Sequence, residues 1–489
     1  MKIQNFCFVI PNSSWFDKRY WHNFPYTVGL LVAVIKRAGW NVSVIDANMD
    51  NLSEEQLSRA LENLAPDVVA LSAMTIEYQR TTHRTFKVIK DALPEAITVL
   101  GGVYSTLSPE VARKDPNIDY IVCGEGEERI VKLLQSIEGG RIGLDKIDGL
   151  IYRDDDGVSR YAPPASVVAD LDSLPMPDYS LFDMKRYTNH GQKYTQNFNF
   201  RGYPWAQSIT SRGCPFRCSF CASNNVYGTK IRYHSPERVL AEVDWLVKEY
   251  GIKEMIWVDD SYLQDTERCK TIFKGLIDRK YDMYWKSNNM SIFLMTDEIL
   301  DMMAASGCYQ VSISIESGHP RTLRRIRKPV NLEKIPPRID KMKQLGMEII
   351  SNFVVGFPGE TWDEIRTTFQ YAEDIDIDYV LFSIATPLPR TPLYDECVAK
   401  KLIPDDFSFE NFEYYGFGKG IITTDDFTPT ELETLRAFEW DRINFKTDEK
   451  KQKICGMLGI TLDELDVWRR ETRRRLGVKV DVADAYIEG

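Results

Sequence analysis

Apolar positions in the first part of the chain fall alternately in short unbroken runs and in runs with helical spacing. NFCFVI (5–10) and DVVALSA (67–73) are almost fully apolar and predict buried strands, while TVGLLVAVIKRAG (27–39) predicts a helix that ends at glycine. Apolar strands that alternate with helices are typical of a parallel sheet covered on both faces. Residues 1–140 therefore predict an α/β domain.

A second alternation of strands and helices begins at residue 206 and continues to about residue 400. Between the two lies a segment rich in Pro, Asp and Ser, which predicts a linker over residues 141–205. The second alternation contains about six strand–helix units, which favours an open or partial (β/α)6 barrel with its chemistry at the carboxyl ends of the strands. Residues 401–489 predict a small, mainly helical region.

Small polar residues and glycines follow three strands of the first domain, at the sheet edge where parallel α/β folds bind ligands. These candidates are Ser72, Thr75, Gly101, Gly102 and Gly126. Glycine lets a backbone approach a ligand closely, and although a structural turn is the better explanation for any single glycine pair, three such strand ends together favour a binding edge. The first strand is not followed by G-x-G-x-x-G, and the Walker phosphate loop is absent, which argues against NAD or ATP.

Three cysteines, Cys214, Cys218 and Cys221, lie on the loop after the first strand of the barrel, with the spacing C-x3-C-x2-C. A structural zinc site uses four protein ligands, and an iron–sulfur cluster bound by cysteine normally uses four thiolates. Three thiolates would hold three irons of a [4Fe–4S] cluster and leave the fourth iron to an outside ligand. The spacing favours such a cluster, with zinc or unrelated thiols as alternatives.

The cysteine motif and several later segments resemble the radical S-adenosylmethionine (SAM) superfamily. Phe220 precedes the last cysteine, and the similar segments are IWVDDSYLQD (256–265), VSISIESG (311–318), FVVGFPGET (353–361) and ATPLPRTPLYDE (385–396). With the Rossmann-like N-terminal domain, the whole resembles the cobalamin-binding class of this superfamily. The resemblance implies a [4Fe–4S] cluster on the three cysteines, SAM at the open iron, and cobalamin on the N-terminal sheet.

The resemblance also implies which residues contact SAM, namely Phe220, Asp259, Asp260, Ser314, Glu316 and Gly356. Phe220 would pack near the adenine, with ordinary core packing as the alternative. Asp259 and Asp260 would accept hydrogen bonds from the SAM ammonium or ribose, and one of them is otherwise a helix N-cap. Glu316 follows an apolar strand and needs a partner if it is buried. Gly356 would let the backbone approach adenine, or would simply form a turn.

The same resemblance implies that Ser72, Thr75, Gly101, Gly102 and Gly126 contact cobalamin. Many cobalamin domains carry an Asp-x-His-x-x-Gly loop whose histidine binds cobalt. Here DANMDN (46–51) lacks histidine, and residues 11–24 offer only His22. We therefore predict cobalamin without a lower histidine ligand, and the alternative is a domain that has lost cobalamin.

Three features lie outside these motifs. Arg390 stands where relatives often have glycine, and it either reaches the substrate or is solvated. The aromatic segment FENFEYYGFGKG (409–420) either lines a pocket for an apolar substrate or packs the tail against the barrel. The basic run RRETRRR (469–475) is either a solvated helix face or a phosphate-binding patch.

Composition narrows the function further. The net charge of −11 argues against nucleic acid as the main partner, and no apolar run is long enough for a membrane helix. The nine cysteines are odd in number and irregularly spaced, so they predict a protein of the reducing cytoplasm without a disulfide framework.

Together with the resemblance, the sequence predicts a B12-dependent radical SAM methyltransferase. It would act on an unactivated carbon of a small molecule through a 5′-deoxyadenosyl radical and methylcobalamin. The alternatives are cyclisation, oxidation or rearrangement without methyl transfer and, in another class, a non-catalytic iron–sulfur sensor or binding protein. The expected partners are a secondary metabolite, lipid or pigment precursor as substrate, and an electron donor such as flavodoxin or ferredoxin.

Overall fold

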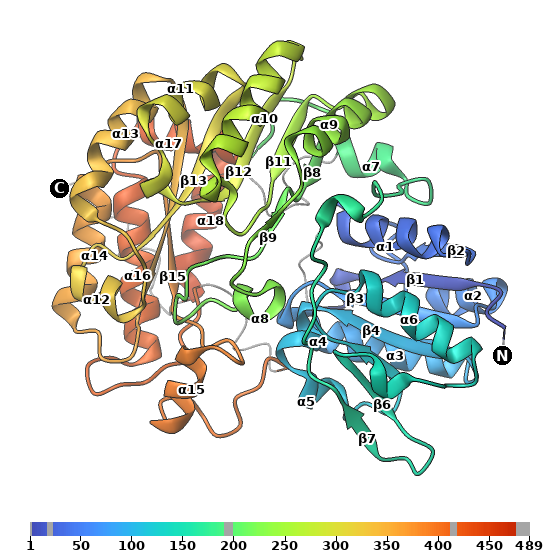
Figure 1. The fold of residues 1–489 in the computed structure, drawn as a ribbon. Coiled ribbons are helices and arrows are strands. Elements are labelled where there is room, and N and C mark those ends of the chain that lie inside the picture. The colour runs from blue at the N-terminus through green and yellow to red at the C-terminus, as the bar shows by residue number, and fades with distance from the viewer. Residues whose placement is uncertain (1, 17–22, 190–198, 411–417, 476–489) are drawn as a thin grey trace. The chain divides into compact units, whose positions relative to one another are not determined.

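The computed structural model describes residues 2–16, 23–189, 199–410 and 418–475 (Figure 1). The chain forms two compact units whose boundaries cross the cysteine motif. The first unit comprises Met1–His190, Arg212–Cys214 and Ala222–Arg238, and the second comprises Gly191–Ser211, Pro215–Cys221 and Val239–Gly489.

The first unit is built on a seven-stranded sheet with the order β2-β1-β3-β4-β5-β6-β7. Its strands are β1 (Phe6–Ile10), β2 (Val42–Asp46), β3 (Val68–Ala73), β4 (Ile97–Gly102), β5 (Tyr120–Val122), β6 (Leu150–Arg153) and β7 (Ser159–Tyr161). The first five are parallel, as the apolar runs predict, and β6 and β7 pair antiparallel. The chain runs from β1 to β2 on one side of β1 and then returns to β3 on its other side. The sheet therefore has a topological switch point between β1 and β3.

Residues 150–161 extend this sheet, although their polar neighbours predict a linker. Leu150 and Ile151 are buried, and Leu150 joins the same core as Phe6 and Leu133. The alternation is too short to stand out between the Asp- and Pro-rich stretches on either side. Pairing of β6 with β5 places Leu150 in the hydrophobic core of the first unit.

Helices cover both faces of the sheet in the first unit. On one face, α1 (Tyr26–Arg37) packs beside α6 (Glu127–Glu138), and on the other α2 (Glu54–Leu64) packs beside α3 (Gln79–Ala92) (Figure 1). The unit also contains short elements, among them α4 (Val103–Leu107), α5 (Pro109–Ala112), α7 (Met184–Asn189), α8 (Ser223–Tyr227) and β10 (Arg232–Tyr233), which pairs with β9 (Ser211–Arg212).

The second unit contains six parallel strands in chain order, β8-β11-β12-β13-β14-β15. These are β8 (Trp205–Ser208), β11 (Glu254–Trp257), β12 (Tyr284–Met290), β13 (Cys308–Glu316), β14 (Glu348–Val355) and β15 (Tyr379–Ile384). The helices that follow the strands are α9 (Pro236–Tyr250), α10 (Thr266–Arg279), α11 (Asp297–Ala305), α12 (Pro320–Arg325), α13 (Ile335–Gln344), α14 (Trp362–Asp374) and α15 (Pro392–Ala399). Sequential parallel pairing that stops at β15 confirms the predicted partial barrel.

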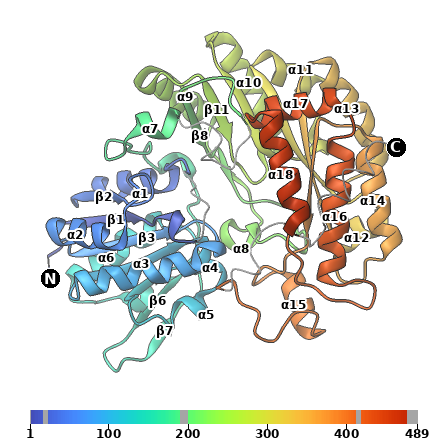
Figure 2. The ribbon, with the colours of Figure 1, turned by 180° about the vertical axis from the view of Figure 1, so that it is seen from behind.

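The C-terminal helices close the open edge of this partial barrel. Figure 2 shows α16 (Pro429–Asn444), α17 (Asp448–Leu458) and α18 (Leu462–Arg475), which pack against one another. Asn444 Oδ1 accepts from the Val380 N–H at 2.8 Å and its Nδ2 donates to the Val380 carbonyl at 2.9 Å. A helix side chain thus occupies backbone groups that an edge strand would otherwise expose. Within the described ranges, no helix is long and apolar enough to cross a membrane.

Candidate cluster and SAM site

The cysteine loop is anchored at its centre by backbone hydrogen bonds in the second unit. The Ser219 N–H donates to the Ile326 carbonyl at 2.9 Å, and the Ser219 carbonyl accepts from the Leu393 N–H at 2.9 Å. Cys214 and Cys218 are half-buried, and Cys221 is exposed. Segments that follow β13 and β15 therefore hold the loop between its second and third cysteines.

No group of three or more His, Cys, Asp and Glu side chains is arranged to hold a metal ion in the part of the chain that the structure describes. The cluster assignment therefore depends on the spacing of the cysteines and on the family comparison below. Metal binding and the ordering of a ligand loop are coupled, because the thiols bind as thiolates.

A buried ion pair lies beside two of these thiols. Lys328 Nζ is 2.9 Å from Glu316 Oε1, and the two side chains are only 15% and 9% exposed. Burial alone would lower the pKa of the Lys328 ammonium, but Glu316 and the thiols of Cys218 and Cys221 outweigh it, so the pKa is raised. The positive charge of Lys328 is thus stabilised by two of the cluster cysteines, and it matches the negative charge of an iron–sulfur cluster.

Sequence reasoning missed Lys328 because it lies in RRIRKP (324–329), a basic stretch that reads as solvated. The chain brings it inward through the contacts of this segment with the cysteine loop, where Cys218 Sγ lies 3.9 Å from the Arg327 carbonyl oxygen. A cation shortly after a strand that ends in a buried acid is the signal that could have identified it.

Ser314 and Glu316 lie at the carboxyl end of β13, as the sequence predicts, and both are buried. The pairing of β13 with β14 shifts register between these two residues. Glu316 has φ +72°, a backbone conformation that residues other than glycine rarely adopt. Such backbone conformations and strand bulges cluster at functional sites, so Glu316 is a candidate for a ligand contact.

Asp259 is fully engaged with the segment that leads into the cysteine loop. It accepts hydrogen bonds from the Thr210 N–H and hydroxyl and from the Ser211 hydroxyl, the last at 2.5 Å. Burial raises the pKa of Asp259 even though these hydrogen bonds lower it. The structure thus places Asp259 behind the loop as a positioning residue, and its half-buried neighbour Asp260 stays the better candidate for a ligand contact.

Phe220 and the Gly356 turn are brought together in the second unit. The ring of Phe220 lies 5.6 Å from the ring of Phe357, centroid to centroid, and is half-buried. Gly356 has φ +87°, a conformation that favours glycine, and a Cβ there would lie 2.6 Å from Leu432 Cδ1. Phe220 makes the core contact that was its alternative role, and its partial exposure leaves one face for a ligand.

Arg390 is exposed and has φ +64°, a backbone conformation that favours glycine. Of the aromatic segment, Phe409 lies in the described ranges and contacts Phe407, with ring centroids 5.0 Å apart. The predictions for Phe412, Tyr414, Tyr415 and Phe417 fall outside the described residues.

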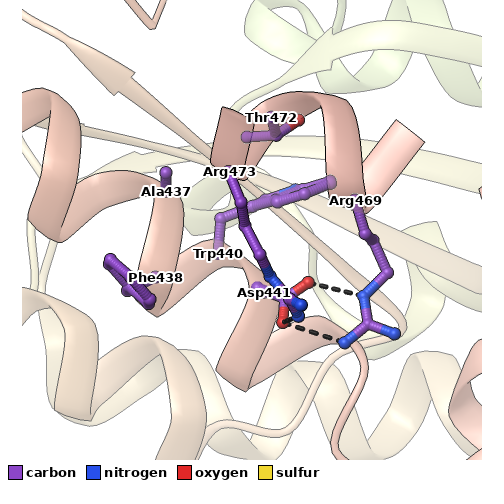
Figure 3. A pocket seen from close by; sticks show the side chains of 7 residues that line it. All are labelled: Ala437, Phe438, Trp440, Asp441, Arg469, Thr472 and Arg473. Atoms are coloured by element: carbon purple, nitrogen blue, oxygen red, sulfur yellow. Dashed lines mark hydrogen bonds and ion pairs between the residues drawn. The ribbon is translucent and has the colours of Figure 1, made fainter. Parts of the chain in front are cut away.

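The basic run of α18 is largely structural. Arg469 Nε and Arg473 Nη2 lie 2.6 and 3.0 Å from the carboxylate of Asp441 on α16, and the two arginine side chains are 11% and 8% exposed (Figure 3). Two of the arginines thus dock one helix on another, which is neither of the roles that the sequence predicts for this run.

The predicted cobalamin residues lie at the carboxyl edge of the first unit's sheet. Ser72 and Ala73 pair with Gly101 and Gly102 at the ends of β3 and β4. Gly102 has φ +98°, and a Cβ there would lie 2.4 Å from the Ala73 carbonyl oxygen, so a side chain is excluded. Thr75 follows β3, and Gly126 directly precedes α6.

The histidines in the described ranges all lie beside carboxylates. His83, His234 and His319 lie 2.5, 3.0 and 3.2 Å from Asp115, Asp172 and Glu364. His83 is also held by the Tyr104 hydroxyl at 2.7 Å. His22 lies outside the described residues, so the prediction of cobalamin without a lower histidine stays a prediction.

Comparison with known proteins agrees with both halves of this architecture. The family model of the radical SAM superfamily matches residues 208–372, and that of the B12 binding domain matches residues 20–134. The uncharacterized methyltransferase PH0819 of Pyrococcus horikoshii is 31% identical over 405 residues, which cover 82% of this chain and 85% of that protein. The chain belongs to the cobalamin-binding radical SAM enzymes.

Two further relatives show the range of this family. The cytidylyl-2-hydroxyethylphosphonate methyltransferase of Streptomyces wedmorensis is 28% identical, over 80% of this chain and 81% of its own. The anaerobic magnesium-protoporphyrin IX monomethyl ester cyclase of Rubrivivax gelatinosus is 28% identical, over 83% and 71%. The family comparisons confirm the enzyme class predicted from the sequence, with a [4Fe–4S] cluster, SAM and cobalamin as cofactors.

The same fold occurs in a solved structure. The cobalamin-dependent SAM radical enzyme OxsB, with aqua-cobalamin and SAM bound, aligns with a TM-score of 0.72 at 17% identity, over 96% of this chain and 72% of that chain. This similarity confirms the predicted fold class, a Rossmann-like parallel-sheet domain followed by a partial barrel and a helical C-terminal region.

Proposed function

We propose that this enzyme is a methyltransferase that acts on an unactivated carbon of a small molecule. The observation that carries the SAM-binding part of the proposal is the Lys328–Glu316 ion pair, whose lysine also interacts electrostatically with Cys218 and Cys221. An amino acid presents one ammonium and one carboxylate group. A buried glutamate and a buried lysine match these two charges, and charge-assisted hydrogen bonds are the strong ones.

The candidate SAM and cluster residues each have a defined part in this arrangement. Glu316 accepts hydrogen bonds from the SAM ammonium, while Lys328 donates to the SAM carboxylate and balances the thiolates. Ser314 adds a hydroxyl beside Glu316, and Asp260 accepts from the ribose. Phe220 and the Gly356 turn form the apolar wall for adenine. The three cysteines bind the cluster.

The first unit holds the second cofactor in this proposal. Ser72, Thr75, Gly101, Gly102 and Gly126 present backbone and hydroxyl groups to cobalamin at the carboxyl ends of β3, β4 and β5. When bound, the cluster and SAM supply the 5′-deoxyadenosyl radical, and cobalamin carries the methyl group. The protein positions the reactants and excludes water.

Methyl transfer is supported by two relatives named as methyltransferases, and ring closure is supported by the relative named as a cyclase. We propose methyl transfer first and cyclisation second. We also propose that the enzyme works in the reducing cytoplasm with a flavodoxin or ferredoxin as electron donor, because free cysteines and a reducible cluster need such conditions.

Anaerobic reconstitution tests the proposal. Iron, sulfide and cobalt per chain are measured, and SAM is added with a reductant. Formation of 5′-deoxyadenosine together with S-adenosylhomocysteine supports methyl transfer, while 5′-deoxyadenosine alone supports the cyclase alternative. Absence of SAM cleavage in the cluster-loaded protein favours a sensor, and cleavage without bound cobalt removes cobalamin from the proposal.

A matched pair of variants makes the result specific. Cys218→Ala removes one predicted cluster ligand, and Cys455→Ala removes a buried thiol of α17. We expect iron content and SAM cleavage to be lost in the first and kept in the second. Equal behaviour of the two variants would contradict the assignment of the cysteine loop.

A further inference from the structure

Four charged side chains form a buried ion network in the first unit, namely Glu125, Glu127, Arg212 and Arg232. Arg212 Nη2 lies 2.6 Å from Glu127 Oε1, and its Nη1 lies 3.5 Å from Glu125 Oε1. Arg232 Nη2 lies 2.7 Å from Glu125 Oε1, and its Nη1 donates to Glu125 Oε2 at 2.8 Å. The side chains of Glu125, Arg232, Arg212 and Glu127 are 1%, 5%, 7% and 7% exposed, so all four charges are removed from water.

The two acids and the two bases come from different functional segments. Glu125 and Glu127 flank Gly126, one of the predicted cobalamin residues, after β5. Arg212 lies in β9, two residues before Cys214, and Arg232 lies in β10, after the cysteine loop and α8. The buried ion network therefore joins the cobalamin edge to both strands that flank the cysteine loop.

The start of the cysteine loop is itself rigidly built. The Cys214 N–H donates to the Gly228 carbonyl at 3.3 Å. Gly213 has φ +96°, and a Cβ there would lie 2.6 Å from the Lys230 carbonyl oxygen. Arg212 and Cys214 are therefore joined by a close-packed turn at Gly213 that excludes a side chain.

The network is better suited to fixing a geometry than to stabilising the fold. Taking four charges out of water is costly, and apolar replacements of buried ion pairs are often neutral or stabilising. Glu127 Oε2 and Arg232 Nε are buried without a hydrogen-bond partner among the described residues. The network does fix the orientation of its side chains. The Arg232–Glu125 contact is bidentate, and Glu125 Oε2 also accepts from the Val168 N–H at 2.7 Å.

We propose that Glu125, Glu127, Arg212 and Arg232 are positioning residues that set the distance between the Cys214 end of the cluster loop and the cobalamin edge. The inference rests on the proposed function, because it requires both cofactors to act on one substrate. A displacement of about 1 Å between reacting groups can reduce a rate on the order of a hundredfold. An ion network that joins both segments keeps such a displacement small.

Pulsed electron paramagnetic resonance tests this in the reconstituted full-length enzyme. The reduced [4Fe–4S] cluster and cob(II)alamin each carry an unpaired electron, so their dipolar coupling reports the distance between them. The unaltered enzyme should give one narrow distance distribution. Glu127→Gln and Arg212→Lys should broaden or shift it, and should lower the yield of S-adenosylhomocysteine relative to 5′-deoxyadenosine on the order of tenfold.

Controls separate this role from general destabilisation. Arg212→Lys keeps the charge but lacks the fork that spans two carboxylates, so it tests geometry apart from charge balance. Should Glu127→Gln fail to fold, Arg212→Lys and Arg232→Lys give the same comparison. Arg469→Gln breaks a buried ion pair of the second unit and should leave the distance distribution unchanged.

The two proposals fail in different ways. Folded variants that carry both spin signals and keep the unaltered distance distribution would overturn the positioning role and leave the proposed function standing. Absence of a cobalt signal in the unaltered enzyme would remove cobalamin from the proposed function, and the positioning role would fall with it.

Discussion

Asp259 accepts a hydrogen bond from the hydroxyl of Ser211 at 2.5 Å, three residues before the first cysteine of the cluster motif. The same carboxylate accepts from the N–H and hydroxyl of Thr210, so one buried side chain at the end of β11 fixes the segment that enters the loop. Asp259 therefore positions Thr210 and Ser211, the residues that lead into the cysteine loop.

Replacing Asp259 with Asn should therefore loosen the cluster loop. The amide nitrogen of Asn would replace Oδ2, which accepts from the Thr210 N–H at 3.1 Å, so two buried donors would face each other at a cost of about 1–3 kcal/mol. We expect a lower unfolding midpoint and less iron per chain after reconstitution. Asp260→Asn is the matched control and should keep the iron content. Equal iron in both variants would contradict the positioning role of Asp259.

Lys328→Met should weaken SAM binding while the cluster is retained. Loss of a buried charge-assisted contact costs about 1–3 kcal/mol, which corresponds to roughly 5- to 150-fold in the dissociation constant. Equilibrium dialysis of the cluster-loaded protein with labelled SAM measures it. Lys334→Met changes an exposed lysine nearby and should leave the affinity unaltered. Unchanged affinity in Lys328→Met would remove Lys328 from the SAM site.

The sequence predicts the elements well because they are local signals, whereas the role of the three cysteines as cluster ligands stays a prediction. Apolar runs such as residues 67–73 mark strands wherever they occur, and the spacing of Cys214, Cys218 and Cys221 is visible without a structure. The fold class follows from the order of these elements along the chain.

The long-range partners could not be predicted because nothing local reports them. Arg212 and Glu127 are 85 residues apart, and each alone reads as a solvated charge. Lys328 is buried only because its segment docks on the cysteine loop. Asp259 looks like a ligand residue in sequence, and the structure shows that its oxygens are already occupied by the preceding strand segment.

Glu360 should make folding stability depend on pH. It is buried under the Gly356 turn, where its Oε2 accepts from the Gly356 and Phe357 N–H groups at 2.7 and 3.1 Å. Burial raises the pKa of Glu360 to about 7, from an ordinary 4.5. Between these values the unfolded chain releases the proton and the folded chain keeps it, so the free energy of unfolding falls as pH rises, by about 1–3 kcal/mol in all.

Glu360→Gln removes this titration while it keeps an acceptor oxygen for the turn. We expect the variant to be less sensitive to pH between 4.5 and 7, and to be at least as stable as the unaltered chain at pH 8. Urea unfolding across this pH range measures both. Glu333→Gln, at an exposed position, is the control. A pH profile that Glu360→Gln leaves unchanged would show that Glu360 does not carry this dependence.

Asp441→Asn should detach α18 from α16. The Asp441 side chain is 14% exposed and pairs with Arg469 and Arg473, so its neutralisation removes one ion pair from each of two largely buried guanidinium groups and costs about 2–4 kcal/mol. Burial acts to raise the pKa of Asp441, but Arg469 and then Arg473 outweigh it, and the pKa is lowered. A lowered pKa in the folded state means that the stabilisation is complete above the unfolded value near 3.9 and is lost as pH falls further.

The difference in unfolding free energy between Asp441→Asn and the unaltered chain should thus be largest at pH 6–8 and shrink below pH 4. Arg474→Gln, which changes a 72% exposed arginine of the same helix, should have little effect at any pH. If Asp441→Asn is as stable as Arg474→Gln at pH 7, the ion pairs of α18 do not hold it in place. Phosphate then becomes the test ligand for the basic run, because its arginines would be available to an anion.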